Sequence, residues 1–295
     1  MSPGASGVVG FCPMSKKSAT KHDIAAFYDR LSPHFRALWG PHLHDGFYRT
    51  GQESKEEAQE ELVRFLAAEA GLERGIRVLD IGCGMGATSV ALARDFDCTV
   101  SGITLSQVQV DLARALAEEQ GLSESVRFQV MDADRIDLDG DFLGGEPLDA
   151  LWMVGVLGHL PDQPAFVRDS PRLLRPGGTF ILGDWMVAPD VTEAEWAKLI
   201  GPVRAGMLMP TIRSLPETVT WFREAGYSVR VERDITAETL KTWDHGVSIL
   251  KAKAVWDLAR ELGRDALDLL AAIRGMKRAM KAGKIVYGVV IAERT

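Results

Sequence analysis

The chain has 295 residues, a formal net charge of -7 and a hydrophobic fraction of 46%. This length suits one elaborated α/β domain or a core domain with a cap. The acidic balance argues against nucleic-acid binding, which requires a basic face. No run reaches the ~18 apolar residues of a membrane-spanning helix, so no membrane partner is expected.

The cysteines and the first residues bear on the cellular compartment. The chain has three cysteines, Cys12, Cys83 and Cys98. An odd number without the spacing of metal ligands favours a reduced, cytoplasmic protein. Residues 1–21 are small and polar, and their lysines follow the only apolar patch. A signal peptide has the opposite order, so a flexible tail is expected.

Helices are expected before the first strand and strand–helix alternation after it. Apolar spacing predicts helices over 22–38 and 54–70, joined by a loop at 41–51, and these helices should form part of a cap. Residues 71–187 then alternate between strands and helices. The predicted strands are 76–81, 98–103, 126–131, 149–153 and 179–185, and the helices are 88–95, 106–120 and 163–174. Such alternation predicts a doubly wound α/β fold with a mostly parallel sheet.

The pattern changes after residue 187. The expected elements are helices over 192–204 and 215–225, a strand over 227–233, a helical stretch over 236–282 and a last strand over 284–293. The long helical stretch is expected to break near 243–246 and at Gly263. Residues 188–295 should therefore complete the sheet and contribute helical insertions that cover the substrate.

The most informative segment is the glycine-rich stretch Val78–Gly86. Gly82, Gly84 and Gly86 separate a buried strand from a helix, which brings a ligand against bare backbone at a helix N-terminus. A Cβ atom would block close approach and disfavour positive φ. The stretch also satisfies the dinucleotide-binding pattern G-x-G-x-x-G/A.

Two observations separate a nicotinamide dinucleotide from another ligand. The second strand ends at Thr104, without the acidic residue that binds ribose hydroxyls in dinucleotide sites. Asp80, just before the glycines, would repel a pyrophosphate but receive an ammonium group. A ligand with an amino acid moiety fits better, and S-adenosylmethionine (SAM) is such a ligand.

Further motifs give the chain a resemblance to class I SAM-dependent methyltransferases. They are 102–109, 126–133, 148–153, 158–162 and 173–180, and upstream 27–29 and 39–48. The last two resemble the γ-tocopherol-methyltransferase-like group, whose N-terminal region certain bacterial natural-product O-methyltransferases share. The resemblance implies a seven-stranded sheet with an antiparallel last strand, SAM as cofactor and S-adenosylhomocysteine (SAH) as product.

The residues implied to bind the cofactor are Tyr28, Asp80, Gly82, Gly84, Gly86, Thr104, Leu105, Gln109, Asp132, Ala133 and Met153. Asp132 would accept a hydrogen bond from the adenine amine. Alternatives remain for several of them. Thr104 and Gln109 are also consistent with a helix start, Asp132 with a turn and Tyr28 with core packing.

His159 and Asp184 are the candidate catalytic pair. His159 follows the fourth strand, at the sheet edge where ligands of α/β proteins bind. A histidine accepts a proton near neutral pH, and Asp184 at the end of the fifth strand would orient it. Related enzymes carry His-His or Glu-His here, whereas this chain has Gly158-His159. The alternatives are a packing histidine and a helix-capping aspartate.

Two groups of residues surround this candidate pair. Trp185, Met186, Met207 and Trp243 are expected to line a greasy substrate chamber, although each also suits a plain core. His42, His44 and Asp45 invite a metal interpretation, but no further ligand pattern supports it, so no metal is expected. The resemblance places their loop at the methionine end of SAM.

These observations predict a SAM-dependent methyltransferase of secondary metabolism acting on a lipophilic small molecule. Carbon methylation is slightly favoured, because the tocopherol-like motifs match and Gly158 removes a polar group. The alternatives are an O- or N-methyltransferase with His159 and Asp184 as base pair, an NAD-dependent oxidoreductase and a non-catalytic SAM-binding protein. The sequence determines neither the acceptor nor the oligomeric state.

Overall fold

The computed structural model describes residues 19–295, so residues 1–18 of the predicted tail, Cys12 included, lie outside the described residues. Lys21, which the prediction assigns to the tail, is instead the first residue of helix α1 (Lys21–Leu38). The cause is a capping box, in which the Thr20 hydroxyl accepts from the Asp23 backbone N–H and the Asp23 carboxylate accepts from the Thr20 N–H.

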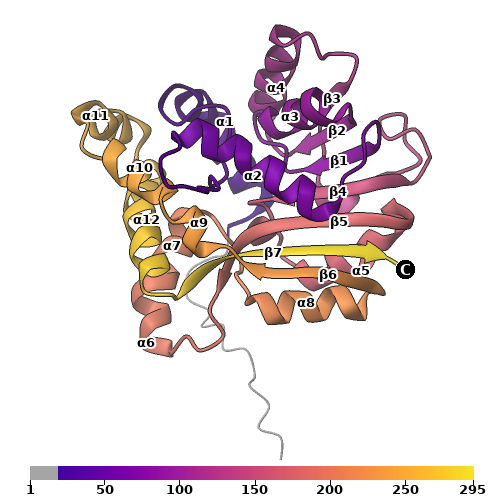
Figure 1. Cartoon of the computed structure of the whole chain (residues 1–295). Helices are drawn as coiled ribbons and strands as arrows, with labels where there is room; N and C mark the ends of the chain where they lie inside the picture. The colour runs from indigo at the N-terminus through magenta and orange to yellow at the C-terminus, as the bar shows by residue number, and fades with distance from the viewer. Residues whose placement is uncertain (1–18) are drawn as a thin grey trace, which may run out of the picture.

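A seven-stranded mixed sheet with the order β3-β2-β1-β4-β5-β7-β6 forms the centre of the molecule (Figure 1). Its strands are β1 (Arg77–Ile81), β2 (Thr99–Thr104), β3 (Val126–Val130), β4 (Leu148–Val154), β5 (Leu174–Val187), β6 (Tyr227–Asp234) and β7 (Ile285–Arg294). Neighbours among β1 to β5 are parallel, and β7 is antiparallel to both β5 and β6. The predicted α/β fold is thereby confirmed.

The helices follow the predicted order with small changes at their ends. They are α2 (Lys55–Ala70), α3 (Ala87–Phe96), α4 (Gln107–Glu119), α5 (Gln163–Asp169), α6 (Glu193–Glu195), α7 (Gly201–Gly206), α8 (Leu215–Glu224), α9 (Thr236–Thr239), α10 (Thr242–Ile249), α11 (Lys253–Leu262) and α12 (Arg264–Lys281). A π-helical turn over Trp196–Ile200 joins α6 to α7. Short 3-10 turns cover Ala133–Arg135, Leu157–His159 and Ser170–Leu173.

The predicted break near 243–246 is wrong. Helix α10 runs through this segment, and the chain leaves the helix at residues 240–241 and 250–252 instead. Gly246 does not end the helix, because its role is close packing. A Cβ atom there would lie 3.2 Å from Ile273 Cγ2 of α12 and 3.6 Å from Trp39.

The sheet is buried on both faces, which explains the nearly continuous apolar runs of its central strands. Alternate residues of each strand face opposite sides. Leu79, Leu151 and Leu182 pack in the core that includes α5 and α8, whereas Trp152 and Ile181 pack in the core that includes α2 and α3. This alternation decides which strand residues reach a ligand at the sheet edge.

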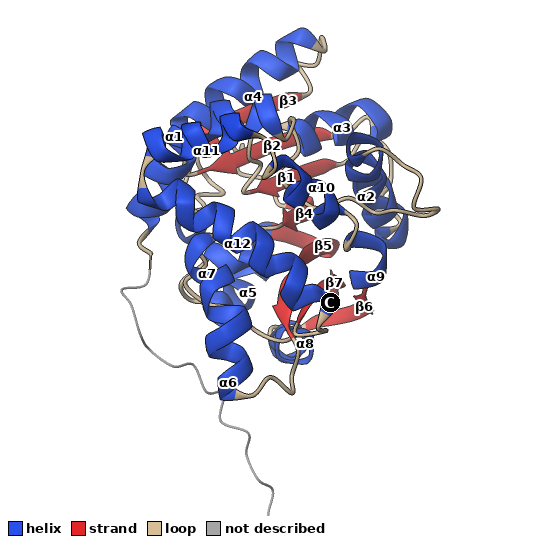
Figure 2. Cartoon of the chain, turned by 90° about the vertical axis from the view of Figure 1, so that its left-hand side faces the viewer, coloured by secondary structure: helices blue, strands red, loops and turns tan. Residues whose placement is uncertain are grey.

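Helices α1, α7, α10, α11 and α12 gather beyond the carboxyl ends of the parallel strands, on the left of Figure 1 and toward the viewer in Figure 2. Helices α7 and α12 approach closely because residue 206 is glycine. A Cβ atom there would lie 2.4 Å from the Asp268 carbonyl oxygen and 2.6 Å from Ala272 Cβ.

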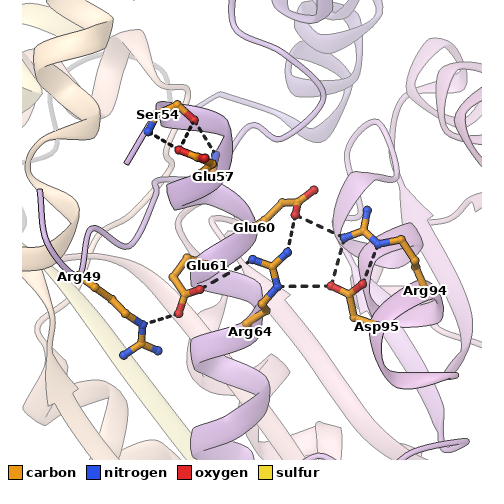
Figure 3. Close-up of polar contacts among 8 residues, drawn as sticks. All are labelled: Arg49, Ser54, Glu57, Glu60, Glu61, Arg64, Arg94 and Asp95. Atoms are coloured by element: carbon orange, nitrogen blue, oxygen red, sulfur yellow. Dashed lines mark hydrogen bonds and ion pairs between the residues drawn. The ribbon is translucent and has the colours of Figure 1, made fainter. Parts of the chain in front are cut away.

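A surface network of ion pairs links α2 to α3 (Figure 3). Arg64 of α2 contacts Glu60, Glu61 and Asp95, and Arg94 of α3 contacts Glu60 and Asp95. Each exposed pair contributes at most about 1 kcal/mol, but the shared partners favour one alignment of the two helices. Within residues 19–295, none of the helices has the length and apolar character needed to cross a membrane.

Candidate active site

A cavity opens at the carboxyl edge of the sheet, beneath α1 and the helices α10 to α12. Most of the predicted site residues line it together. These are Tyr28, Asp80, Gly82, Gly84, Thr104, Leu105, Gln109, Asp132, Ala133, His159, Trp185, Met207 and Trp243. One half of the cavity is bounded by the glycine loop and the ends of β1 to β3, and the other half is mainly apolar.

The glycine loop has the backbone conformation that its sequence predicts. Gly82, Gly84 and Gly86 have φ values of +73°, +53° and +82°, which side-chain-bearing residues rarely adopt. The backbone N–H groups of Gly82 and Cys83 donate to the Ile103 carbonyl at 2.8 and 3.0 Å and fix the loop to β2. Bare backbone therefore faces the cavity ahead of α3.

Asp80 is a buried carboxylate beneath this loop. It is 3% exposed and accepts a hydrogen bond from the Ser89 hydroxyl at 2.6 Å. Burial raises the pKa of Asp80 to about 7. In the described part of the chain no ion pair neutralises it, so a cation in the cavity would be stabilised here. The ammonium group of SAM fits this arrangement.

The raised pKa of Asp80 predicts a stability difference on the alkaline side. Folding favours the protonated carboxyl, so its contribution is complete below the unfolded pKa and is lost as pH rises through about 7. Between pH 6.5 and 8 the ligand-free protein should lose about 1 kcal/mol through this group. Urea unfolding at both pH values would measure the loss, and Asp80→Asn should lack it. An unchanged pH dependence in the variant would contradict this assignment.

The opposite edge of this half is formed by the ends of β2 and β3. The Thr104 hydroxyl donates to Gln109 Oε1 at 2.6 Å, and the Ser106 hydroxyl both caps α4 and donates to Asp29 of α1 at 2.6 Å. Asp29 also accepts from the Val108 N–H at 3.2 Å. These bonds join α1 to the edge where a ribose would lie.

Asp132 has a partner that the sequence did not predict. Lys21 Nζ lies 2.6 Å from Asp132 Oδ2 and 2.5 Å from Asp134 Oδ2. Lys21 also lines the cavity, so the first turn of α1 covers the expected adenine position. The prediction missed it because Lys21 was assigned to the tail, and only the Thr20 capping motif signals a helix start there.

The 42–45 loop lies over the glycine loop and the start of α3. The His44 Nδ1–H group donates to the Asp45 carbonyl at 2.7 Å, so its Nε2 accepts from His42 Nδ1 at 3.0 Å and from Thr88 Oγ1 at 3.2 Å. Burial lowers the pKa of His42 well below its usual value and that of His44 to about 4. Both rings are therefore neutral at pH 7.

His159 is bonded through both ring nitrogens. Nδ1 lies 3.1 Å from the Leu208 carbonyl oxygen, and Nε2 lies 3.0 Å from the Tyr28 hydroxyl. Because a carbonyl oxygen only accepts, Nδ1 carries the proton and Nε2 accepts from the Tyr28 O–H. Burial lowers the pKa of His159 below its usual value. The ring is thus a neutral base joined to a phenol.

The predicted contact between Asp184 and His159 does not form. Asp184 is 2% exposed and accepts from the backbone N–H groups of Trp185 at 2.7 Å and Gly158 at 3.3 Å. It does not line the cavity. Burial raises the pKa of Asp184 to about 6. The carboxylate accepts a hydrogen bond from the backbone of the 3-10 turn that carries His159. It therefore fixes the backbone of this turn and does not contact the imidazole ring.

Three further predicted site residues are corrected. The side chains of Met153 and Met186 pack in the core on the α5 and α8 side, because strand alternation directs them away from the cavity. Gly86 caps α3 and does not line the cavity. A Cβ atom at Gly86 would lie 2.6 Å from Ala113 Cβ of α4, so this glycine permits helix packing.

The apolar half of the cavity contains Trp185 and Trp243, whose rings meet edge to face with centroids 5.6 Å apart. Trp185 Nε1 donates to Asp45 Oδ2 at 2.7 Å, which fixes its indole. Sequence reasoning missed many other lining residues, because their apolar periodicity is that of any packed helix. They are Ile24, Phe27, Phe35, Leu38, Ile249, Leu250, Val255, Leu269, Leu270 and Ile273.

The sheet order, the antiparallel β7 and the glycine loop above Asp80 define a class I SAM-dependent methyltransferase. The sequence model of mycolic acid cyclopropane synthetase matches residues 15–263, and the chain belongs to this family. It is a methyltransferase that uses SAM, releases SAH and acts on small molecules, natural products among them.

Individual relatives agree with this assignment. The chain is 32% identical over 226 residues to 27-O-demethylrifamycin SV methyltransferase of Amycolatopsis mediterranei (strain S699), covering 76% of this chain and 80% of that protein. It is 38% identical over 174 residues to a probable chloroplastic tocopherol O-methyltransferase of Oryza sativa subsp. japonica, covering 56% of this chain and 47% of that protein. It thus spans about half the length of the rice protein.

A solved structure shows the same fold. The cyclopropane synthase MmaA2 from Mycobacterium tuberculosis superposes with a TM-score of 0.81 at 18% identity, covering 95% of this chain and 100% of that chain. At this identity the likeness supports the architecture alone. The predicted seven-stranded sheet with an antiparallel last strand is the fold of that protein as well.

Proposed function

We propose that this enzyme methylates a hydroxyl oxygen of a lipophilic small molecule, a natural product, and that Tyr28 and His159 take up the proton released. The observation that carries this proposal is the 3.0 Å contact between the Tyr28 hydroxyl and His159 Nε2 within an otherwise apolar chamber. A neutral base at this place serves an acceptor that must lose a proton.

The cofactor side of the cavity suits SAM in chemistry. Asp80 would receive the ammonium group, Gly82 and Gly84 would admit the ligand against backbone, and Thr104 and Asp132 would face the nucleoside. When bound, SAM supplies a methyl group on a sulfonium centre. In this proposal residues 71–187 bind SAM, and helices from 22–70 and 188–295 cover the substrate.

The two ring contacts of His159 define a path for the proton. The acceptor hydroxyl would give its proton to the Tyr28 oxygen while the Tyr28 proton moves to His159 Nε2. The Nδ1–H group stays hydrogen-bonded to the Leu208 carbonyl. The imidazolium that forms then donates to this carbonyl and to the Tyr28 hydroxyl oxygen. Burial raises the pKa of Tyr28 to about 12, so the phenol stays protonated before the reaction.

The apolar walls contribute by position and by exclusion of water. Methyl transfer requires an in-line approach, and holding the acceptor near the methyl group supplies much of the rate. Trp185, Trp243 and Met207 line the chamber. A greasy acceptor would displace water from these surfaces on binding, which also strengthens the polar contact at Tyr28.

Oxygen is preferred to carbon as the acceptor atom in this proposal. The preference for carbon depended on the tocopherol-like motifs and on the missing polar group at Gly158. Tyr28, from a helix distant in sequence, places a hydroxyl beside His159 instead. The names of the rifamycin and tocopherol relatives also specify O-methylation. Carbon methylation, with the two tryptophans stabilising positive charge, is the second candidate.

The test of this proposal is methyl transfer to panels of matched lipophilic acceptors. The purified enzyme would be incubated with methyl-deuterated SAM and phenols, aliphatic alcohols or their hydroxyl-free analogues. We expect products only from hydroxyl-bearing compounds, with the label on oxygen by NMR. Label on carbon would overturn the oxygen assignment, and transfer to polar acceptors alone would overturn the lipophilic one.

The size of the chamber predicts that a larger side chain in its wall will weaken the binding of bulky acceptors. Gly246 lines the cavity on α10, so Gly246→Leu should raise KM for a bulky acceptor at least tenfold and leave SAH binding unchanged. Steady-state kinetics and titration with SAH would measure both effects. Ala254→Leu on the exposed face of α11 is the matched control. Equal KM values for Gly246→Leu and the wild type would place the substrate elsewhere.

A further inference from the structure

Residues 207–210, here called the elbow, contain a strained backbone conformation. Leu208 has a φ value of +52°, one of two positive values among the described non-glycine residues. A leucine rarely adopts this region, and such outliers persist only where surrounding contacts impose them.

Arg204 of α7 clamps the elbow. Its Nη1 donates to the carbonyl oxygens of Met209 at 3.1 Å and Pro210 at 2.5 Å. The backbone closes the same turn, because the Met209 N–H donates to the Arg204 carbonyl at 2.9 Å. Nε of Arg204 is buried without a hydrogen-bond partner in the described structure. The guanidinium therefore forms its hydrogen bonds with backbone carbonyl oxygens.

The elbow holds the turn that carries His159 at two points. The Leu208 carbonyl accepts from His159 Nδ1 at 3.1 Å. Met209 fills the space beside Gly158, where a Cβ atom would lie 2.9 Å from its Sδ. Side-chain packing and a backbone acceptor thus fix both the position of the turn and the rotation of the imidazole.

We propose that Arg204 is a positioning residue that holds the Leu208 carbonyl against His159 and so keeps the imidazole in the Nδ1–H tautomer. This inference rests on the proposed function, in which His159 Nε2 accepts the proton. Asp184 does not perform this task, because backbone N–H groups occupy it. A carbonyl acceptor fixes the tautomer without placing a negative charge beside the ring, which keeps the imidazole neutral in the resting enzyme.

The test compares Arg204→Met, which lacks the donors, with Arg204→Lys, which keeps the charge. Nitrogen-15 NMR of the histidine side chains would report the tautomer, with the His159 signal assigned from a His159→Gln variant. In Arg204→Met we expect a mixture of tautomers and a kcat lowered 10- to 100-fold, with unchanged SAH affinity. Arg204→Lys should recover part of both, and Arg278→Met on the exposed face of α12 should match the wild type.

The two readouts separate the inference from the proposed function. An unchanged tautomer in Arg204→Met would overturn the positioning role, whatever happens to kcat. A mixed tautomer with full kcat would support the clamp and overturn the role of His159 as base. If Arg204→Met fails to fold, Arg204→Gln replaces it. Its shorter side chain cannot reach the Met209 and Pro210 carbonyls together, so tautomer purity should again fall, and a single retained tautomer would contradict the proposal.

Discussion

His159→Ala is expected to lower kcat by about 10²- to 10⁴-fold, because general-base catalysis contributes a factor of this size. The affinity for SAH should stay within about twofold, since the His159 ring is bonded to Tyr28 and the Leu208 carbonyl and lies outside the glycine loop. Tyr28→Phe should also lower kcat, but by a smaller factor. Turnover with a confirmed acceptor and isothermal titration with SAH measure the two quantities.

The control is His22→Ala, which removes an exposed histidine from α1. The pH profile adds a second check. Only the neutral imidazole accepts a proton, so kcat/KM should fall on the acid side, and burial places that fall below pH 6.5. Full turnover in His159→Ala, or an acid limb unchanged in that variant, would remove the base from the mechanism.

Gly82→Ala should abolish measurable SAH binding and cost about 2–4 kcal/mol of unfolding free energy. Gly82 has a φ value of +73°, and a Cβ atom there would lie 2.3 Å from Val156 Cγ2. Val156 is a β-branched side chain with little rotamer freedom. The loop must therefore shift, and the backbone that faces the cavity shifts with it. Urea unfolding and SAH titration measure the two losses.

Gly121→Ala separates backbone strain from steric overlap. Gly121 has a similar φ value of +68°, but nothing lies within 4 Å of its would-be Cβ atom. This control should lose only about 1–2 kcal/mol through strain and keep full SAH affinity. Equal losses of unfolding free energy in Gly82→Ala and Gly121→Ala would mean that the overlap with Val156 is relieved without an energetic cost.

Local sequence patterns were sufficient for the strands of the sheet, and sequence motifs were sufficient for most residues along the glycine-loop half of the cavity. Strand residues were identified because apolar runs, glycines and helical spacing are local signals. The carboxyl ends of parallel strands meet at one edge, so the sequence was sufficient to place Asp80, Thr104 and Asp132 at one cavity. The errors at Met153 and Met186 arose where a one-residue step along a strand changes the face.

The polar partners of the reacting half could not be predicted in this way. Tyr28 and His159 are 131 residues apart, and nothing in either segment signals their hydrogen bond. The pairing of His159 with Asp184 was a reasonable expectation, yet backbone N–H groups bind that carboxylate. The actual orienting group is a main-chain carbonyl, which every residue possesses and no side-chain pattern marks.

The sequence by itself therefore determined the α/β class and the succession of strands and helices along the chain, because repeating local patterns specify them, and its motifs carried the resemblance to SAM-dependent methyltransferases. Only the tertiary structure decided which groups contact His159 and how the helices α1, α10 and α12 line the cavity. The physical reason is that these contacts join segments far apart in the chain, where the packing of whole helices sets the distance between two polar atoms.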